Sequence, residues 1–372
     1  MRQYYSNTGE KVSSLIQKYK IDIQPSKLYT LFPNIACKET CEWCGSQLEL
    51  LALSKTAMTS RDQQYKKRCP GCSHTLNDKM CECDMCKTQR EKIKYEKERQ
   101  EREHGIFLRK QIQKVYRREA EGLIKFEDIG FLEKVYLGAI ARGFLSEDLN
   151  TILPIEPSVL SPDGRISADI VNKLTHQRIL VVDPVSDIED FVQDENFPKT
   201  YYIFKVKYGI NLHLPPDKGE FIKQIMYPSA LKEEDKETAY ILWKTIAIEE
   251  CIQYLIYQLE QVRFEFAPGD KTYAIFEELL AHYSVSQIFG IIWRKVSDAA
   301  RFYQEGGITK KHAANTVIGG CLSFGERARI NNWDITQYSR IKELPQTLIS
   351  QFFFNQVLHI GEMGFHMPPT RP

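Results

Sequence analysis

The strongest constraint on the fold is a group of eight of the ten cysteines, which fall between Cys37 and Cys86. Six of them form three Cys-x2-Cys pairs, and two stand outside these pairs. The eight are Cys37, Cys41, Cys44, Cys69, Cys72, Cys81, Cys83 and Cys86. A Cys-x2-Cys turn directs two sulfurs at one cation with bonds of about 2.3 Å, and a tetrahedral zinc ion needs two such pairs. The stretch therefore predicts two zinc sites.

Metal binding is favoured over disulfides by the rest of the chain. The amino terminus reads Met-Arg-Gln-Tyr-Tyr-Ser-Asn and lacks the apolar core of a secretory signal. No apolar run is long enough to span a membrane. We therefore expect a cytoplasmic protein, and clustered cysteines in the cytoplasm are typical of metal sites.

The spacing leaves the partition between the two sites open. The preferred partition gives one ion Cys41, Cys44, Cys69 and Cys72. It gives the other ion Cys37, Cys81, Cys83 and Cys86, with His74 as a possible substitute for Cys37. An alternative joins Cys69 and Cys72 to Cys83 and Cys86. Thiolates can fill every position, whereas a catalytic zinc keeps one position open for water, so both ions are expected to be structural.

Two features of this stretch carry a resemblance to a known superfamily. Cys41-x2-Cys44 is followed by Gly45, which supplies the positive φ of a metal knuckle. Cys83-x2-Cys86 stands where a long polar helix is expected to begin. This arrangement resembles the zinc-ribbon and treble-clef superfamily over residues 37–86. The resemblance implies metal binding and no particular function.

The amino-terminal part of the chain is basic. Residues 1–131 carry 25 Lys/Arg and 18 Asp/Glu, although the whole chain has a net charge of only +1. Residues 87–121 are predicted to form a connecting helix, interrupted at Gly105. Beyond Gly105 its outer face is basic and is a candidate phosphate contact. The basic residues there are Arg109, Lys110, Lys114, Arg117 and Arg118.

Residues 122–230 are predicted to form a small α+β domain. Helices are expected around Leu132–Ala139 and, with Ser167 as its cap, at Ala168–Arg178. Strands are expected at Ile179–Val182 and Tyr201–Ile210. Helices followed by a hairpin are similar to a winged helix, whose third helix would present Lys173 and His176 to nucleic acid. The acidic loop 183–200 favours a protein partner instead.

Residues 231–372 are predicted to be a helical bundle. The expected helices are Glu237–Gln261, Tyr273–His282, Gln287–Tyr303, Lys310–Ala328 and Leu344–Ile360. The predicted fold class is therefore mainly α with a small β component. The four predicted parts are residues 1–86, 87–121, 122–230 and 231–372.

The sequence contains no strong sign of catalysis. We find no phosphate-binding loop, nucleophile elbow, dinucleotide fingerprint or kinase motif set. Glu278 and His282 are spaced for a metal or an acid–base pair, but no second such pair accompanies them. Asp217, Glu220 and Lys223 lack the spacing of a PD-(D/E)xK nuclease.

The function that these observations favour is a zinc-stabilised scaffold or adaptor. It would bind nucleic acid through its basic amino-terminal half and a protein through its acidic remainder. One alternative is a pure protein-interaction subunit with structural zinc. A second is a nuclease-type enzyme whose site is assembled from residues distant in the sequence. No small-molecule substrate and no membrane are indicated.

Overall fold

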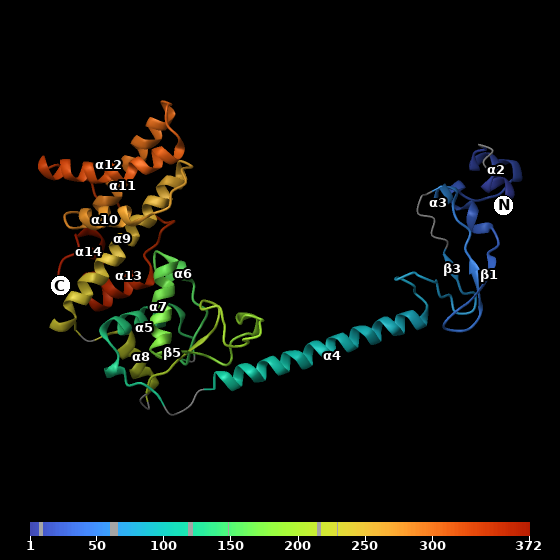
Figure 1. Cartoon of the computed structure of the whole chain (residues 1–372), viewed down its shortest axis with the longest axis horizontal. Helices are drawn as coiled ribbons and strands as arrows, with labels where there is room; N and C mark the ends of the chain where they lie inside the picture. The colour runs from blue at the N-terminus through green and yellow to red at the C-terminus, as the bar shows by residue number, and fades with distance from the viewer. Residues whose placement is uncertain (7–9, 60–65, 118–121, 148, 214–216, 229) are drawn as a thin grey trace. The chain divides into compact units, whose positions relative to one another are not determined.

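The computed structural model in Figure 1 describes the chain except residues 7–9, 60–65, 118–121, 148, 214–216 and 229. The chain divides into two compact units, Met1–Phe107 and Leu108–Pro372. Its regular structure is mostly helical, with two small three-stranded sheets, so the predicted mainly α class is confirmed. In the described residues, no helix is long and apolar enough to cross a membrane.

The first unit begins with three short helical segments. These are α1 (Arg2–Tyr5), α2 (Val12–Tyr19) and the 3-10 helix η1 (Pro25–Leu31). They enclose a small core of Tyr4, Leu15 and Leu28. In α2, Val12, Leu15 and Ile16 stand at i, i+3 and i+4, so these apolar side chains lie on one face of the helix.

A three-stranded antiparallel sheet follows, with the strand order β1-β2-β3. The strands are β1 (Ile35–Thr40), β2 (Gln47–Leu50) and β3 (Lys67–Arg68), and the short helix α3 (Lys55–Thr59) lies between β2 and β3 in the chain. Ile35 pairs with Leu50, and Glu49 pairs with Arg68. The cysteine pairs at 41–44 and 69–72 lie in the turns where β1 and β3 end.

The helix α4 runs without a break from Asp84 to Val115. The interruption predicted at Gly105 is wrong. Glycine costs about 1 kcal/mol relative to alanine in a helix interior. This cost is offset by strong helix formers and by ion pairs one turn apart, such as Lys97 with Glu101 (3.7 Å) and Arg99 with Glu103 (3.3 Å).

The second unit contains helices and a sheet in its first half. The helices are η2 (Phe126–Asp128), α5 (Phe131–Phe144), α6 (Pro157–Leu160), α7 (Gly164–His176), η3 (Ile188–Asp190) and α8 (Lys218–Met226). The strands are β4 (Thr151–Ile152), β5 (Leu180–Val182) and β6 (Tyr208–Ile210). The sheet is antiparallel with the order β4-β6-β5.

Two details of this half differ from the prediction. The strand predicted at Tyr201–Ile210 is reduced to its last three residues, because residues 202–206 turn back on themselves through Val206 N–H donating to Tyr202 O (3.2 Å). Helix α7 starts earlier than predicted, and its cap is Asp163, whose carboxylate accepts from Arg165 N–H. Ser167 is buried inside the helix. The winged-helix likeness stays a prediction.

The second half of this unit is a set of packed helices. They are η4 (Glu233–Asp235), α9 (Lys236–Gln261), α10 (Asp270–Leu280), α11 (Val285–Gln304), α12 (Lys310–Ile330), α13 (Leu348–Phe352), the π-helical η5 (Phe353–Val357) and α14 (Met363–His366). Helix α11 packs against both α9 and α12 (Figure 1). Apolar periodicity predicted the ends of α9, α10, α11 and α12 within three residues. The helix predicted at Leu344–Ile360 is shorter, since it begins at Leu348, becomes π-helical at Phe353 and ends at Val357.

One hydrophobic core joins both halves of the second unit. It extends from Ile112 to Phe365 and includes buried residues of α5, α7 and the carboxy-terminal helices. Helix α13 lies on α5, where Phe352 covers Gly138 so closely that a Cβ there would collide with its ring. The predicted division between residues 230 and 231 therefore does not separate two cores.

Candidate metal centres

Four cysteines form the first cluster. The Sγ atoms of Cys41, Cys44, Cys69 and Cys72 all lie within 4.8 Å of one another. Cys41 and Cys72 are 3.5 Å apart, and Cys44 and Cys69 are 3.3 Å apart. Tetrahedral bonds of about 2.3 Å would separate two sulfurs by about 3.8 Å. The cluster therefore has the size and the donors for one metal ion, and it is the set that the sequence favoured.

The two turns that supply these sulfurs have the same backbone design. In each, the residue after the second cysteine has a positive φ, 71° at Gly45 and 59° at Ser73. Its N–H donates to the carbonyl of the first cysteine, over 2.9 Å from Gly45 to Cys41 and 2.9 Å from Ser73 to Cys69. This closure points both sulfurs of each pair to the same side.

The second cluster contains one histidine and three cysteines. His74, Cys81, Cys83 and Cys86 also have ligand atoms within 4.8 Å of one another. His74 Nδ1 lies 3.5 Å from Cys81 Sγ, 3.7 Å from Cys83 Sγ and 3.2 Å from Cys86 Sγ. Cys86 lies in the first turn of α4, and its N–H donates to Cys83 Sγ (3.4 Å).

The structure places His74, and not Cys37, in the second cluster. Cys37 lies on β1, outside both clusters, with its Sγ 3.7 Å from Ile35 O. His74 stands two residues after Cys72 in the chain, and the turn closed by Ser73 reverses the chain between them. The alternative that joined Cys69 and Cys72 to Cys83 and Cys86 is not the arrangement that the structure shows.

Within each cluster, the local surroundings lower the pKa of one thiol and raise the pKa of another. Hydrogen bonds from Ser46 lower the pKa of Cys44 to about 6. Burial opposes ionisation of Cys81, but backbone N–H groups that donate to its sulfur outweigh burial and lower its pKa to about 6. Burial raises the pKa of Cys72 to about 12 and that of Cys86 to about 11. A cation is needed to hold all the sulfurs as thiolates.

A carboxylate connects the two clusters. Glu42, inside the first cysteine pair, has Oε1 3.3 Å from Nε2 of His74, and this contact does not meet the geometry of a hydrogen bond. The Trp43 ring meets the His74 ring edge to face at 6.2 Å. His74 is 4% exposed, so Glu42 supplies a charge beside an otherwise unpartnered buried nitrogen. Carboxylates in this position orient metal-bound histidines.

The structure separates the predicted phosphate contacts into two groups. Lys110, Lys114 and Arg117 are exposed and form no ion pair with the described residues. Arg109 is instead part of the fold, since its guanidinium donates to Ser186 O (2.5 Å) and Pro184 O (3.3 Å). The predicted contact at Arg118 lies outside the described residues.

The other predicted functional residues are not assembled into one site. Lys173 forms an ion pair with Glu133 (3.2 Å), and His176 is exposed at the end of α7. His282 Nε2 contacts the Arg329 guanidinium at 2.7 Å. The structure therefore gives no support to an acid–base role for Glu278 and His282, for which only their i, i+4 spacing spoke.

The sequence patterns did not indicate an aromatic pocket in the second unit. Trp293 lies on α11, Phe324 on α12, and Trp333 and Tyr338 lie in the segment that follows α12. The exposure of Trp293 and Trp333 would have indicated such a pocket, but exposure cannot be read from the sequence.

Comparison with known proteins does not place these features in a described group. No protein-family profile matches the chain, and neither a curated protein nor a solved structure matches it with significance.

Proposed function

We propose that the protein is a zinc-stabilised scaffold or adaptor that binds nucleic acid and also contacts a protein partner. The observation that carries the proposal is the pair of four-ligand clusters in the first unit. The second of these clusters lies at the start of α4, the helix that carries the exposed basic residues near its other end. The donor atoms of the clusters and the charge of α4 together support this function.

The donor atoms indicate which metal the clusters hold. Four sulfurs, or three sulfurs and one imidazole nitrogen, in a tetrahedral cluster are donors typical of zinc. All four positions of each ion are filled by side chains, and Cys41, Cys69, Cys81 and Cys83 are buried. We therefore assign both ions a structural role: each ties together turns in a unit whose own apolar cores are small.

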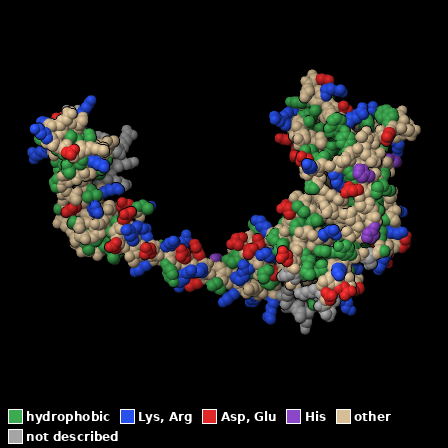
Figure 2. All heavy atoms as spheres, turned by 180° about the vertical axis from the view of Figure 1, so that it is seen from behind, with side chains coloured by type: hydrophobic (Ala, Val, Ile, Leu, Met, Phe, Trp, Pro, Cys, Tyr) green, Lys and Arg blue, Asp and Glu red, His purple; other side chains and the backbone are tan. Residues whose placement is uncertain are grey.

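The charge of α4 supports contact with nucleic acid. Residues 87–118 contain twelve Lys/Arg and five Asp/Glu. All five acidic residues lie before Gly105, where Lys and Arg pair with four of them and the two charges alternate along the helix (Figure 2). Lys110, Lys114 and Arg117 lie beyond them and form no ion pair with the residues that the structure describes. Lys110 and Lys114 are four residues apart on one face of α4, and Arg117 follows two residues after the helix ends, so the three can contact successive phosphates.

Salt-dependent binding to labelled DNA and RNA tests the contact with nucleic acid. The variant with Lys110, Lys114 and Arg117 changed to Ala should bind at least about tenfold more weakly, and the slope of log affinity against log salt should fall by about 3. The matched control replaces Lys94, Lys97 and Arg99 by Ala. It removes the same charge where acidic neighbours already compensate it. Equal losses in both variants, or no binding at low salt, would refute the proposal.

Zinc content tests the assignment of two structural zinc ions separately. Elemental analysis of protein purified without chelator should find about two zinc ions per chain. A strong chelator should unfold the first unit and leave the helical content of the second unchanged, because zinc binding supplies folding free energy only where the ligands are.

A second candidate is a protein-interaction subunit without nucleic-acid contact. It is favoured by the exposed acidic side chains of the loop 183–200, which would repel phosphates. These are Asp187, Glu189, Asp194 and Glu195. Full zinc content together with no binding to nucleic acid at low salt would support this candidate.

A further inference from the structure

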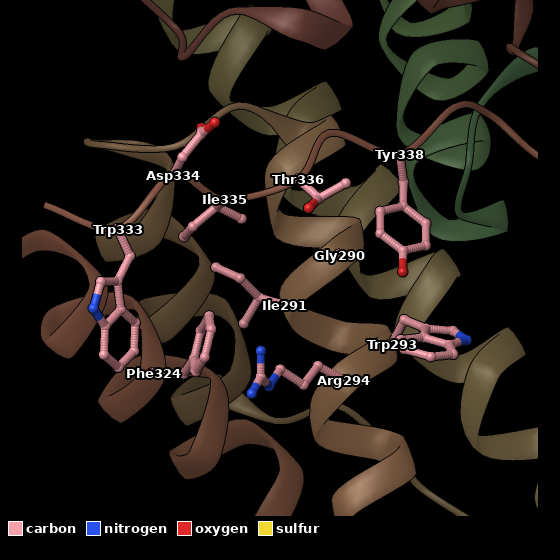
Figure 3. A pocket seen from close by; sticks show the side chains of 10 residues that line it. All are labelled: Gly290, Ile291, Trp293, Arg294, Phe324, Trp333, Asp334, Ile335, Thr336 and Tyr338. Carbon is pink, nitrogen blue, oxygen red and sulfur yellow. The ribbon is translucent and has the colours of Figure 1, made fainter.

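A pocket of about 340 Å³ lies beside α11 in the second unit. Figure 3 shows its walls: α11 contributes Trp293 and Arg294, α12 contributes Phe324, and the segment after α12 contributes Trp333 and Tyr338. Binding pockets for small molecules begin at about 300 Å³. The volume therefore suits one compact group.

Backbone contacts hold the pocket in shape. Tyr338 N–H donates to Ser286 O (3.0 Å), and Trp333 N–H donates to Ala328 O (2.8 Å). A Cβ on Gly290 would approach Thr336 O to 2.7 Å, so α11 and the segment 333–338 lie in close contact there. The aromatic side chains therefore project from a fixed frame.

Two pairs of aromatic rings line the pocket. Trp293 and Tyr338 have centroids 6.1 Å apart with planes 34° apart, and Phe324 and Trp333 are 5.8 Å and 49° apart. Trp293 is 47% exposed and Trp333 is 49% exposed. Half-exposed indoles in a pocket offer faces on which a planar ring can stack.

The Arg294 cation lies between the two ring pairs (Figure 3). The Arg294 guanidinium is 5.0 Å from the centre of the Phe324 ring, and it forms no ion pair with the described residues. Lys295 approaches the same ring, but its charge is paired with Asp298 at 2.6 Å. Figure 3 shows the Asp334 carboxylate at the rim, turned away from Arg294. Arg294 therefore has donors free for a ligand.

The surrounding segment has the same sign of charge as Arg294. Residues 285–340 carry eight Lys/Arg and four Asp/Glu, whereas residues 132–372 as a whole have a net charge of −6. A local positive excess within an acidic region favours an anionic ligand at this place.

From these observations we propose that the pocket binds a nucleobase that carries a phosphate, with the base stacked on the indoles and the phosphate on Arg294. Planar guanidinium groups bind phosphate with paired donors. Proline-rich peptides also bind aromatic grooves, but such a peptide offers Arg294 no phosphate to bind. The pocket shares no residue with the metal clusters or with Lys110, Lys114 and Arg117, so this proposal is independent of the proposed function.

Tryptophan fluorescence of the full-length zinc-bound protein tests this site. Adenosine, guanosine, cytidine and uridine monophosphates are titrated one at a time. At least one should quench the emission saturably. The matching nucleoside, which lacks the phosphate, should bind at least about tenfold more weakly, and ribose 5-phosphate, which lacks the base, should not quench. An oligothymidylate of eight residues serves as the single-stranded source of the same group.

Matched variants assign the signal to the pocket. Trp333→Ala and Arg294→Ala should each raise the dissociation constant about tenfold or more. The controls are Phe302→Ala and Arg301→Ala, exposed side chains on α11 that do not line the pocket. Circular dichroism confirms that each variant is folded.

The outcomes separate the sources and the alternatives. Tighter binding of the oligothymidylate than of any mononucleotide, lost in Trp333→Ala, identifies single-stranded nucleic acid as the source, and the reverse identifies a free nucleotide. The inference is overturned if no nucleotide quenches saturably at millimolar concentration, or if only a proline-rich peptide does. It is also overturned if the quenching by mononucleotides survives both Trp333→Ala and Arg294→Ala, since the nucleotide would then bind outside the pocket.

Discussion

The Glu42 carboxylate lies 3.3 Å from Nε2 of His74, while Nδ1 of the same ring faces the three sulfurs of the second cluster. Glu42 belongs to the turn that supplies Cys41 and Cys44 to the first cluster. The two candidate metal centres are therefore connected by one carboxylate. Carboxylates commonly orient metal-bound histidines by accepting a hydrogen bond from the second ring nitrogen, and Glu42 is the carboxylate beside that nitrogen of His74.

Replacement of Glu42 by Ala should weaken metal binding at the second centre by about 10- to 100-fold and leave the first centre unchanged. Competition with a chromophoric chelator measures both affinities. Glu82→Ala is the control, since it removes an exposed carboxylate between Cys81 and Cys83. If both variants lose the same affinity, the effect is one of general charge.

Exchange of single ligands by Ser or Ala should distinguish His74 from Cys37. Cys69→Ser and His74→Ala should each reduce the zinc content by about one ion per chain and destabilise the first unit, because the remaining donors no longer complete a tetrahedral site. Cys37→Ser should keep both ions. Elemental analysis gives the counts, and loss of an ion in Cys37→Ser would exclude the arrangement described above.

The stability of the second unit should fall as pH rises from about 4.5 to about 7. Burial, with a contribution from the Asp163 charge, raises the pKa of Glu249 to about 7, against the opposing effects of Arg165 and Tyr273. A raised carboxyl pKa means that the native state holds its proton longer than the unfolded state, so stability is highest below the unfolded pKa and declines through the folded pKa.

Glu249→Gln should remove this dependence. Compared with the unchanged protein, the variant should gain up to about 3 kcal/mol of unfolding free energy above pH 7 and little near pH 4. Urea denaturation at several pH values measures the difference. A gain of the same size at every pH would show that ionisation is not its cause.

Loss of Arg340 should destabilise the second unit strongly. Its guanidinium binds both carboxylate oxygens of Glu250, at 3.0 and 3.1 Å, and also stacks on Phe365 at 4.2 Å. Arg340→Ala leaves the buried Glu250 charge uncompensated, which costs about 3 to 5 kcal/mol. The double variant with Glu250→Gln should recover part of this loss in thermal unfolding. No recovery would indicate that packing against Phe365 dominates.

Gly138→Ala should destabilise the second unit by about 1 to 3 kcal/mol, since the added methyl group collides with Phe352. Gly164→Ala is the control, because a Cβ there meets nothing within 4 Å. Residues on both sides of position 230 share one core, so unfolding should remain a single transition at a lower temperature. Two separate transitions would contradict the shared core.

The sequence determined the features that depend on local spacing. Apolar residues at i, i+3 and i+4 located α9, α11 and α12, since a helix needs only one apolar face to be recognised. The Cys-x2-Cys pairs located the metal ligands, because two sulfurs three residues apart in a turn can reach one ion whatever the rest of the chain does. Gly45 was recognised because its turn requires a positive φ.

Only the tertiary structure decided which distant residues meet. The choice of His74 over Cys37 depends on the path of the chain after β3, and no spacing rule measures that distance. Arg109 looked like the other basic residues of its helix until the loop at Ser186 was seen to accept its hydrogen bonds. The aromatic pocket brings together residues of α11, α12 and a later segment. Contacts of this kind arise from packing between elements, whereas sequence patterns report mainly on order within each element.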